Sequence, residues 1–418
     1  MTKRLILAFV FLSWHLVACS NGDSGISSGL PDKPSAEEDS PGTETISEEM
    51  RVKITGEDLY ISAKLDAKTD ILYWFKKCMF NELFTFYRVG TIDNNMPTPA
   101  TLPDASPTSL LNLAYSDNIG PFNITGYGWC GGNHPYLDEV TQTARNIGYR
   151  IYIDGKEIKT DLSTLTKEIK IEVINEIMNP SKADTSSGKT LLNEILCIET
   201  VNYSIYRNNI QVLVTHEFQN ESPVTVQMYY GMQSMFDKET HTLTANGKYV
   251  DWTVQKDVST FTKKEYPSFR RFIEKSANAY QSSYLFADGL GNHEEISDDD
   301  IIFIGNSSNK TYHKIIADRE HKKGDIIHWS GVYTWFKSPV SDDDDLLCYE
   351  GVIDNKKVLF IDCKKSVDRA IQLPVDYTKK SFTIIEKSKS ITITGNKVTA
   401  KGLRIVSDGS GSCVITFD

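Results

Sequence analysis

The sequence predicts an all-β protein, with a large antiparallel β-sandwich of the jelly-roll or super-sandwich type and a smaller C-terminal β module. Many short segments have the composition and alternation of β-strands, and glycine and asparagine turn signals separate them. Helical periodicity is confined to residues 269–280 and, more weakly, residues 70–80. A chain with many short strands and few helices closes its core as a sandwich or a barrel.

The first nineteen residues predict an export signal that ends at a lipid-modified cysteine. Lys3 and Arg4 are followed by an apolar run from Leu5 to Val17, and small residues precede Cys19. This pattern resembles the lipobox of bacterial lipoproteins. The resemblance implies that residues 1–18 are a signal peptide and that a lipid on Cys19 anchors the chain in a membrane. The apolar run is shorter than the roughly twenty residues that a helix needs to span a bilayer.

The next segment, residues 19–49, has the composition of a disordered tether. It consists largely of serine, glycine, proline and acidic residues, with almost no large apolar side chain. Such a segment buries too little surface to offset the loss of chain entropy on folding. The lipobox and this acidic stretch together are similar to the start of surface lipoproteins of gut Bacteroidetes. That similarity implies a lipid-anchored protein of the cell envelope, in the outer membrane.

An acidic run, Ser341–Asp345, divides the rest of the chain. We expect the β-sandwich over residues 50–340 and the C-terminal β module over residues 346–418. The run itself is interpreted as a solvated loop rather than a calcium site, because no regularly spaced set of ligands accompanies it.

The strands that we expect follow from alternation and turn chemistry. A β-hairpin is predicted over residues 149–158, because Asp154 and Gly155 form a favoured two-residue turn. Further strands are expected over Glu168–Ile177, Leu196–Tyr206, Ile210–Phe218, Val224–Gly231, Ile301–Ile304, Ile326–Phe336, Leu346–Ile353 and Lys357–Cys363, with several more between Ser381 and Phe417.

Charge and motif content exclude several function classes. The formal net charge is −11, which disfavours nucleic acid as a partner unless a basic patch intervenes, and the sequence shows none. No GxSxG, HExxH, P-loop or dinucleotide-binding motif is present, and no cysteine or histidine group has zinc-site spacing. We therefore predict no cofactor and no metal. The six cysteines after Cys19 are compatible with disulfides, Cys348 and Cys363 being one candidate pair, and equally with buried thiols.

A glycine-rich stretch, residues 117–145, carries the densest group of candidate site residues. Its glycines at 126, 128, 131 and 132 allow backbone conformations that are closed to other residues. Aromatic faces of Trp129 and Tyr136 suit sugar rings, Asn133 and Arg145 suit a uronate carboxylate, and His134 is a candidate base. The alternative is a loop whose aromatic residues fill a core edge and whose histidine only hydrogen-bonds a backbone carbonyl.

Two consecutive strands, over residues 212–218 and 224–233, carry the second group. Strand alternation and a short connection place His216 and Tyr230 on one shared sheet face, where they could accept and donate a proton. A lone histidine on an apolar face is more often a core residue, so that alternative stays open. The expected substrate-binding residues of this group are Tyr229 and Gln233.

Three functions are compatible with these patterns. The first is a polysaccharide lyase, in which Asn133 and Arg145 neutralise a uronate carboxylate, His134 or His216 removes the C5 proton, and Tyr230 protonates the leaving oxygen. The second is a glycan-binding lipoprotein without catalysis, and the third is a structural or adhesive surface protein. In the first two, the partner is a polysaccharide or an oligosaccharide. Clustering of His134, Arg145 and His216 in one cleft favours the enzyme, and their dispersal argues against it.

Overall fold

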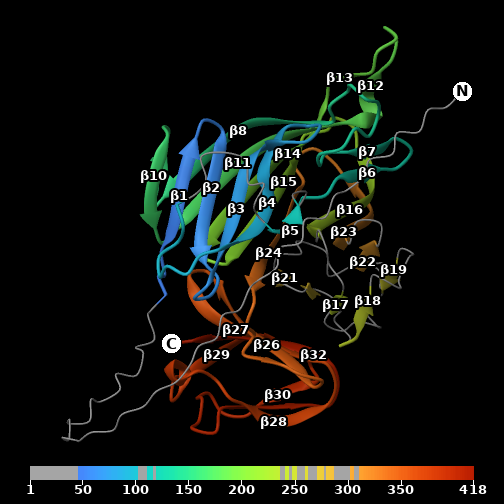
Figure 1. Cartoon of the computed structure of the whole chain (residues 1–418). Coiled ribbons are helices and arrows are strands. Elements are labelled where there is room, and N and C mark those ends of the chain that lie inside the picture. Colours follow the sequence, from blue (N-terminus) through green and yellow to red (C-terminus); the bar gives the residue numbers. More distant parts are fainter. Residues whose placement is uncertain are drawn as a thin grey trace, which may run out of the picture. The chain divides into compact units, whose positions relative to one another are not determined.

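The computed structural model describes residues 46–101, 111–115, 119–235, 241–243, 247–251, 259–261, 271–276, 279–286, 302–305 and 310–418. These residues belong to one compact unit, which runs from Thr45 to Asp418. Apart from two one-turn 3-10 helices, η1 (Pro180–Lys182) and η4 (Val375–Tyr377), the regular structure in these ranges is antiparallel β-sheet (Figure 1). The predicted all-β class is confirmed.

The largest layer is a ten-stranded sheet, the central sheet, with strand order β18-β17-β20-β21-β24-β15-β14-β11-β8-β9. Its long strands alternate as the sequence predicts, with Val173, Val201 and Val212 on the buried face and polar residues on the other. Its strands are β8 (Ala144–Ile153), β9 (Lys156–Ile158), β11 (Ile169–Met178), β14 (Ile195–Tyr206), β15 (Asn209–Phe218), β17 (His241–Leu243), β18 (Tyr249–Asp251), β20 (Arg271–Lys275), β21 (Tyr280–Leu285) and β24 (Ile326–Phe336).

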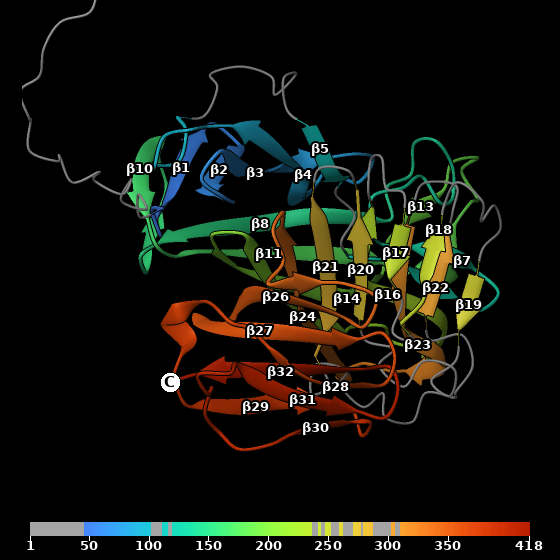
Figure 2. The ribbon, with the colours of Figure 1, turned by 60° about the horizontal axis from the view of Figure 1, so that its bottom comes forward.

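Two six-stranded sheets pack on the buried face of the central sheet. The N-terminal sheet has the order β10-β1-β2-β3-β4-β5, and the β16 sheet has the order β19-β22-β23-β16-β6-β7. One hydrophobic core joins all three sheets. Figure 2 shows the N-terminal sheet lying against the central sheet. The strands of the N-terminal sheet are β1 (Met50–Thr55), β2 (Asp58–Lys64), β3 (Thr69–Cys78), β4 (Leu83–Asp93), β5 (Leu111–Tyr115) and β10 (Leu162–Thr166). The strands of the β16 sheet are β6 (Phe122–Ile124), β7 (Gly128–Cys130), β16 (Val224–Met235), β19 (Ser259–Phe261), β22 (Ile302–Gly305) and β23 (Lys310–His321). A small hairpin of β12 (Ala183–Asp184) and β13 (Leu191–Leu192) stands apart.

The C-terminal module consists of a five-stranded and a three-stranded sheet. It has a hydrophobic core of its own, and it shares a second core with the sandwich, in which Tyr284 and Val332 meet Tyr349 and Phe360. The domain boundary expected at residues 341–345 stays a prediction. The strands are β25 (Ser341–Asp342), β26 (Leu346–Ile353), β27 (Lys356–Cys363), β29 (Phe382–Lys387) and β32 (Gly411–Phe417), with β28 (Val367–Ile371), β30 (Ile391–Ile393) and β31 (Leu403–Ser407) in the smaller sheet.

The acidic run at residues 341–345 is a solvated loop only in part, because Asp343 and Asp344 are exposed but Ser341 and Asp342 form a short strand. Asp342 is largely buried, and its carboxylate lies 2.9 Å from both Lys275 Nζ and Lys364 Nζ. The Tyr280 hydroxyl donates a hydrogen bond of 2.6 Å to the same carboxylate. Because Lys275 and Tyr280 belong to the sandwich and Lys364 to the C-terminal module, Asp342 ties the two together. The sequence alone does not identify these three partners of Asp342, because they lie far from it along the chain.

The turn between β8 and β9 confirms the hairpin prediction. Ile153 pairs with Lys156, so that Asp154 and Gly155 alone form the connection. Their φ angles are 46° and 78°, and both positive values are what a type I′ turn requires. The other predicted strands are also present, within a few residues of the expected bounds.

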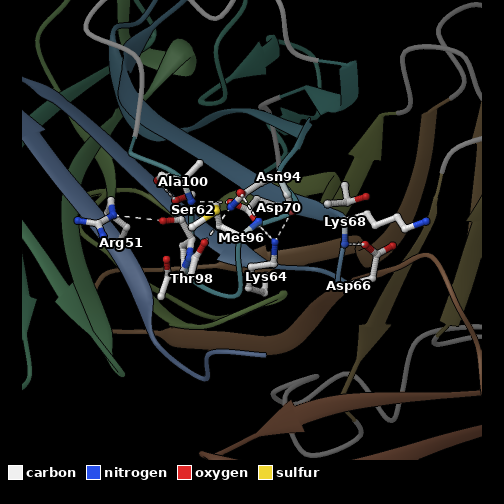
Figure 3. A network of polar contacts seen from close by, with 12 residues as sticks. Arg51, Ser62, Lys64, Asp66, Lys68, Asp70, Asn94, Met96, Thr98 and Ala100 are labelled. Carbon is white, nitrogen blue, oxygen red and sulfur yellow. Dashed lines mark hydrogen bonds and ion pairs between the residues drawn. The ribbon is translucent and has the colours of Figure 1, made fainter. Parts of the chain in front are cut away.

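Both predicted helices are wrong, because strands lie in their place. Residues 70–78 belong to β3, where the loop over residues 94–101 covers part of the outer face and contacts the buried Asp70 (Figure 3). Leu72 is buried as well. In β20, Phe272 contacts the ring of His313 while Ile273 joins the core shared with the C-terminal module. A strand that is buried on both faces no longer alternates between apolar and polar residues, so the sequence pattern that indicates a strand is absent.

The six cysteines after Cys19 are all present as buried free thiols. Cys348 lies opposite Ile361 and Cys363 opposite Leu346, so the candidate disulfide pair is not in direct cross-strand register. Burial raises the pKa of the Cys363 thiol to about 11, which lowers the reactivity of this thiol at neutral pH.

The end of the expected tether contacts the folded unit. The Ser47 amide donates to the carbonyl of Pro97 at 3.0 Å, and the Glu48 carboxylate lies 3.1 Å from the Arg207 guanidinium. The signal peptide, Cys19 and the rest of the tether lie outside the described residues. No helix within the described ranges is long and apolar enough to cross a membrane.

Candidate functional site

An aromatic surface cluster forms where the β6–β7 hairpin meets β16. The turn of this hairpin has three residues, and its central residue, Gly126, has a φ of 82°. Glycine adopts this conformation without strain, so the turn is a direct consequence of the glycine at this position. Trp129 on β7 lies between Tyr230 and Tyr136, at ring-centroid distances of 5.8 and 6.1 Å and interplanar angles of 22° and 30°. His134 contacts the edge of Tyr136 at 5.6 Å. These four half-exposed side chains are called the aromatic platform below.

A β-bulge in β16 decides which tyrosine joins the platform. The register against β6 shifts between Val226 and Met228, and a further shift against β23 follows Tyr229. Tyr229 is therefore fully buried, whereas Tyr230 points to the outer face. Strict alternation from Val224 would have put Met228 and Tyr230 on the buried face and Tyr229 on the outer face.

Gly120 brings a neighbouring segment close to the platform. Its amide donates a hydrogen bond of 3.1 Å to the carbonyl oxygen of Tyr230. A Cβ atom at position 120 would lie only 2.2 Å from that oxygen. Because both contacts involve the backbone of Tyr230, only glycine permits this approach.

Two polar residues that the sequence analysis missed flank the platform. Asn123 lies directly opposite Trp129 in the β6–β7 register, and Lys314 lies opposite Tyr230 in the β16–β23 register. Cross-strand partners share a face of the sheet, with Cβ atoms roughly 5 Å apart. Within the described part of the chain, neither side chain has a hydrogen-bond or ion-pair partner, and the same holds for the indole N–H of Trp129. The alternation of the apolar Phe122 and Ile124 with Asn123 could have indicated that Asn123 lies on the outer face of a strand. No local sequence pattern indicates that Lys314 lies beside Tyr230.

His216 lies in the core and not in the platform. It is fully buried, and its ring contacts the rings of Phe122 and Tyr229 at 4.9 Å each. Its Nε2 lies 2.9 Å from the buried carboxylate of Glu199, which accepts a hydrogen bond of the same length from Asn175. The expectation that His216 and Tyr230 share a face is wrong, because β15 and β16 belong to different sheets. On β16, the residue that faces the core beside His216 is Tyr229 and not Tyr230.

Three expected substrate-binding residues have structural contacts instead. Tyr229 accepts a hydrogen bond of 2.8 Å from the indole of Trp329, and burial raises the pKa of its hydroxyl well above the usual value. Gln233 is buried, and its backbone carbonyl accepts a hydrogen bond of 2.6 Å from the Tyr333 hydroxyl. Asn133 is buried as well, and its side chain accepts a hydrogen bond from the Leu83 amide at the start of β4.

Arg145 lies on the outer face of the central sheet, where it pairs with Glu176 of β11. On that sheet His216 points to the opposite, buried face. His134 belongs to the platform, so the three groups that a lyase would combine are dispersed. The aromatic part of the predicted site comes together with one candidate base, His134, and with the candidate acid, Tyr230, whereas His216 and Arg145 lie elsewhere. Within the described residues, no group of three or more histidine, cysteine or acidic side chains could hold a metal ion.

Comparisons with known proteins give weak likenesses. No family model and no curated protein matches the sequence. Among solved structures, the chain is similar to a GH36 α-galactosidase from Geobacillus stearothermophilus, with a TM-score of 0.38, 9% identity, and coverage of 69% of this chain and 41% of that chain. It is also similar to a polysaccharide lyase, with a TM-score of 0.27, 8% identity, and coverage of 82% and 45%.

A chondroitin AC lyase from Streptomyces coelicolor aligns with a TM-score of 0.21 and 6% identity, over 86% of this chain and 48% of that chain. The chain spans less than half the length of each of these three proteins. With TM-scores below 0.5, these alignments assign neither a family nor an activity to the chain.

Proposed function

We propose that this chain is a lipid-anchored protein of the cell envelope that binds a polysaccharide without turning it over. The observation that carries the binding is the aromatic platform, where Trp129 and its two neighbouring tyrosines present near-parallel rings. Apolar faces of sugar rings pack on such rings, and the Asn123 amide and the Trp129 indole N–H can hydrogen-bond their hydroxyl groups. A row of rings suits a chain of sugars better than a single one.

The placement of the titratable groups favours binding over catalysis. A proton-transfer residue has to come within hydrogen-bond reach of the proton that it moves. His216 is enclosed by aromatic rings and paired with Glu199, and Arg145 is paired with Glu176 on another face. Within the platform, His134 contacts Tyr136, and Trp129 lies between Tyr136 and Tyr230. The platform therefore offers ring faces that hold a glycan.

The lipid anchor is the second part of the proposal, and it is supported by the lipobox that ends at Cys19. We expect Cys19→Ala to abolish incorporation of a fatty-acid analogue during metabolic labelling and to leave the chain unprocessed. The remaining six cysteines are buried thiols that cannot replace it. Labelling of the variant at the wild-type level would refute the anchor without affecting the glycan proposal.

Trp129→Ala tests the platform, with the chain from Ser20 onward and a panel of neutral and uronate polysaccharides in affinity gel electrophoresis. We expect at least about tenfold weaker binding, equivalent to ~1.4 kcal/mol. Tyr152→Ala, which removes a half-exposed tyrosine from the central sheet, serves as the matched control and should change affinity less than about twofold. Lys314→Gln should weaken binding of uronate polymers more than of neutral ones, because it removes a cation beside the rings.

Equal retardation of wild type and Trp129→Ala would contradict the proposed site. The same polysaccharides, incubated with the wild type, should give no product that absorbs in the near ultraviolet. Accumulation of such an unsaturated product would show a lyase and would replace the binding function with an enzymatic one.

A further inference from the structure

The outer face of the N-terminal sheet carries a second group of aromatic and basic side chains, called the outer cluster below. Tyr60 on β2 stacks on Trp74 on β3, with centroids 5.4 Å apart and an interplanar angle of 23°. Tyr87 on β4 meets Trp74 edge to face at 5.0 Å. Lys76 and Arg88 complete the outer cluster, and all five side chains are half-exposed.

The fold creates this group through a bulge in β4. The β3–β4 register shifts between Trp74 and Phe75, so that Tyr87 is an extra residue on β4. Tyr87 and Arg88 consequently both lie toward the outer face. The loop over residues 94–101 covers the other end of this face, where it accepts hydrogen bonds from Arg51, Ser62 and Lys64 (Figure 3).

The rings hold two cations in place. Lys76 Nζ lies 4.1 Å from the centroid of Trp74 and 4.2 Å from that of Tyr87, and the Arg88 guanidinium lies 5.3 Å from the Tyr87 ring. Neither cation has a carboxylate partner in the ranges that the structure describes, and the Nε atom of Arg88 is buried without a hydrogen bond. The nearby carboxylate of Asp58 accepts a hydrogen bond of 2.8 Å from the Trp74 indole.

We propose that the outer cluster is a second binding site, which takes the acidic sugars of a uronate polysaccharide. A carboxylate can pair with Lys76 and Arg88 while both keep their contacts with the rings, so little side-chain freedom is lost on binding. The exposed edges of Tyr60 and Trp74 then lie beside the sugar ring. In a chain with net charge −11, two cations that have no acidic partner among the described residues attract an anion locally.

A polysaccharide fits these observations better than an anionic bilayer. The rings of the outer cluster lie against one another on a sheet, whereas membrane-anchoring aromatic residues reach into the headgroup layer. Glu57 and Asp58 adjoin the outer cluster, and an extended anionic surface would meet them together with the basic pair. A single glycan chain can contact Lys76 and Arg88 without approaching these acids.

The test uses the chain from Ser20 in a Trp129→Ala background, which separates this site from the aromatic platform. Retardation by polygalacturonate, alginate and hyaluronan is compared with retardation by dextran, which is neutral. The double variant Lys76→Gln, Arg88→Gln should bind the uronate polymers at least about tenfold more weakly. About 0.5 M salt should produce a similar loss, since it screens exposed charges.

The matched control is the double variant Lys77→Gln, Arg145→Gln. It removes the same charge, but from residues that already pair with Glu57 and Glu176, and it should bind within about twofold of its parent. Equal losses in the two double variants would show a nonspecific charge effect and overturn the site. Absence of uronate binding in the Trp129→Ala background would do the same, even if the wild type binds through its platform.

Vesicles that contain phosphatidylglycerol form the last arm of the test. Sedimentation with these vesicles that depends on Lys76 and Arg88, together with no retardation by the three uronate polymers, would assign the outer cluster to a membrane surface and refute the glycan assignment. Uronate binding without vesicle binding is the expected result.

Discussion

Asp70→Ala should lower the free energy of unfolding by about 3–5 kcal/mol, because it leaves the Lys64 ammonium buried without its counterion. Both side chains have no exposed surface, and Lys64 Nζ lies 2.8 Å from Asp70 Oδ1. The other carboxylate oxygen accepts hydrogen bonds of 2.7 Å from Asn94 and 2.6 Å from the Ala100 amide. The substitution therefore also releases the loop over residues 94–101 from β3 (Figure 3). Chemical denaturation followed by circular dichroism measures the change.

Two controls separate burial from charge in this prediction. Lys77→Ala breaks an exposed ion pair with Glu57 and should cost less than about 1 kcal/mol. The double variant Lys64→Met, Asp70→Leu should be more stable than Asp70→Ala, because neither charge then stays buried. A free energy of unfolding for Asp70→Ala within about 1 kcal/mol of the wild type would contradict the buried ion pair.

His216→Ala should destabilise the fold by about 3–5 kcal/mol and leave glycan affinity unchanged. The variant leaves the Glu199 carboxylate buried without its imidazole partner, and it opens a cavity between Phe122 and Tyr229. Thermal or chemical unfolding gives the stability, and affinity electrophoresis below the unfolding transition gives the binding.

His134→Ala is the matched control, because it removes the same side chain from the half-exposed platform. It should change the free energy of unfolding by less than about 0.5 kcal/mol and weaken glycan binding through the contact with Tyr136. If His216→Ala kept full stability and lost turnover of a uronate polymer, a catalytic histidine would be established and the binding function would fail.

Local patterns predict a strand well where one face is buried and the other is in water. The strands β11, β14 and β15 alternate clearly, and the Asp154-Gly155 turn sets the register of its hairpin. The first part of β3 and the strand β20 have neighbours on both faces, as the loop over residues 94–101 shows for β3. Their side chains are apolar or paired on both sides, so the period of two that marks a strand is absent.

The candidate site likewise has a part that local sequence determines and a part that depends on long-range strand pairing. Trp129, His134 and Tyr136 come from one short stretch of chain, and local turn chemistry is enough to bring them near one another. Tyr230 joins them only because β16 pairs with β6 across about a hundred residues of sequence. The same strand carries Tyr229 into the core, and a shift of one residue separates the two outcomes.

By itself, the sequence determined that this chain is built from antiparallel strands, where many of them lie, and which glycine-rich stretch presents aromatic side chains. These properties depend on neighbours within a few residues, through side-chain alternation and the φ angles that glycine permits. The tertiary structure alone decided that His216 is a core residue, that Asp342 ties the C-terminal module to the sandwich, and that Lys76 and Arg88 meet on one face. Each of these depends on which strands become neighbours and where a bulge shifts their register, and packing of the whole core settles both.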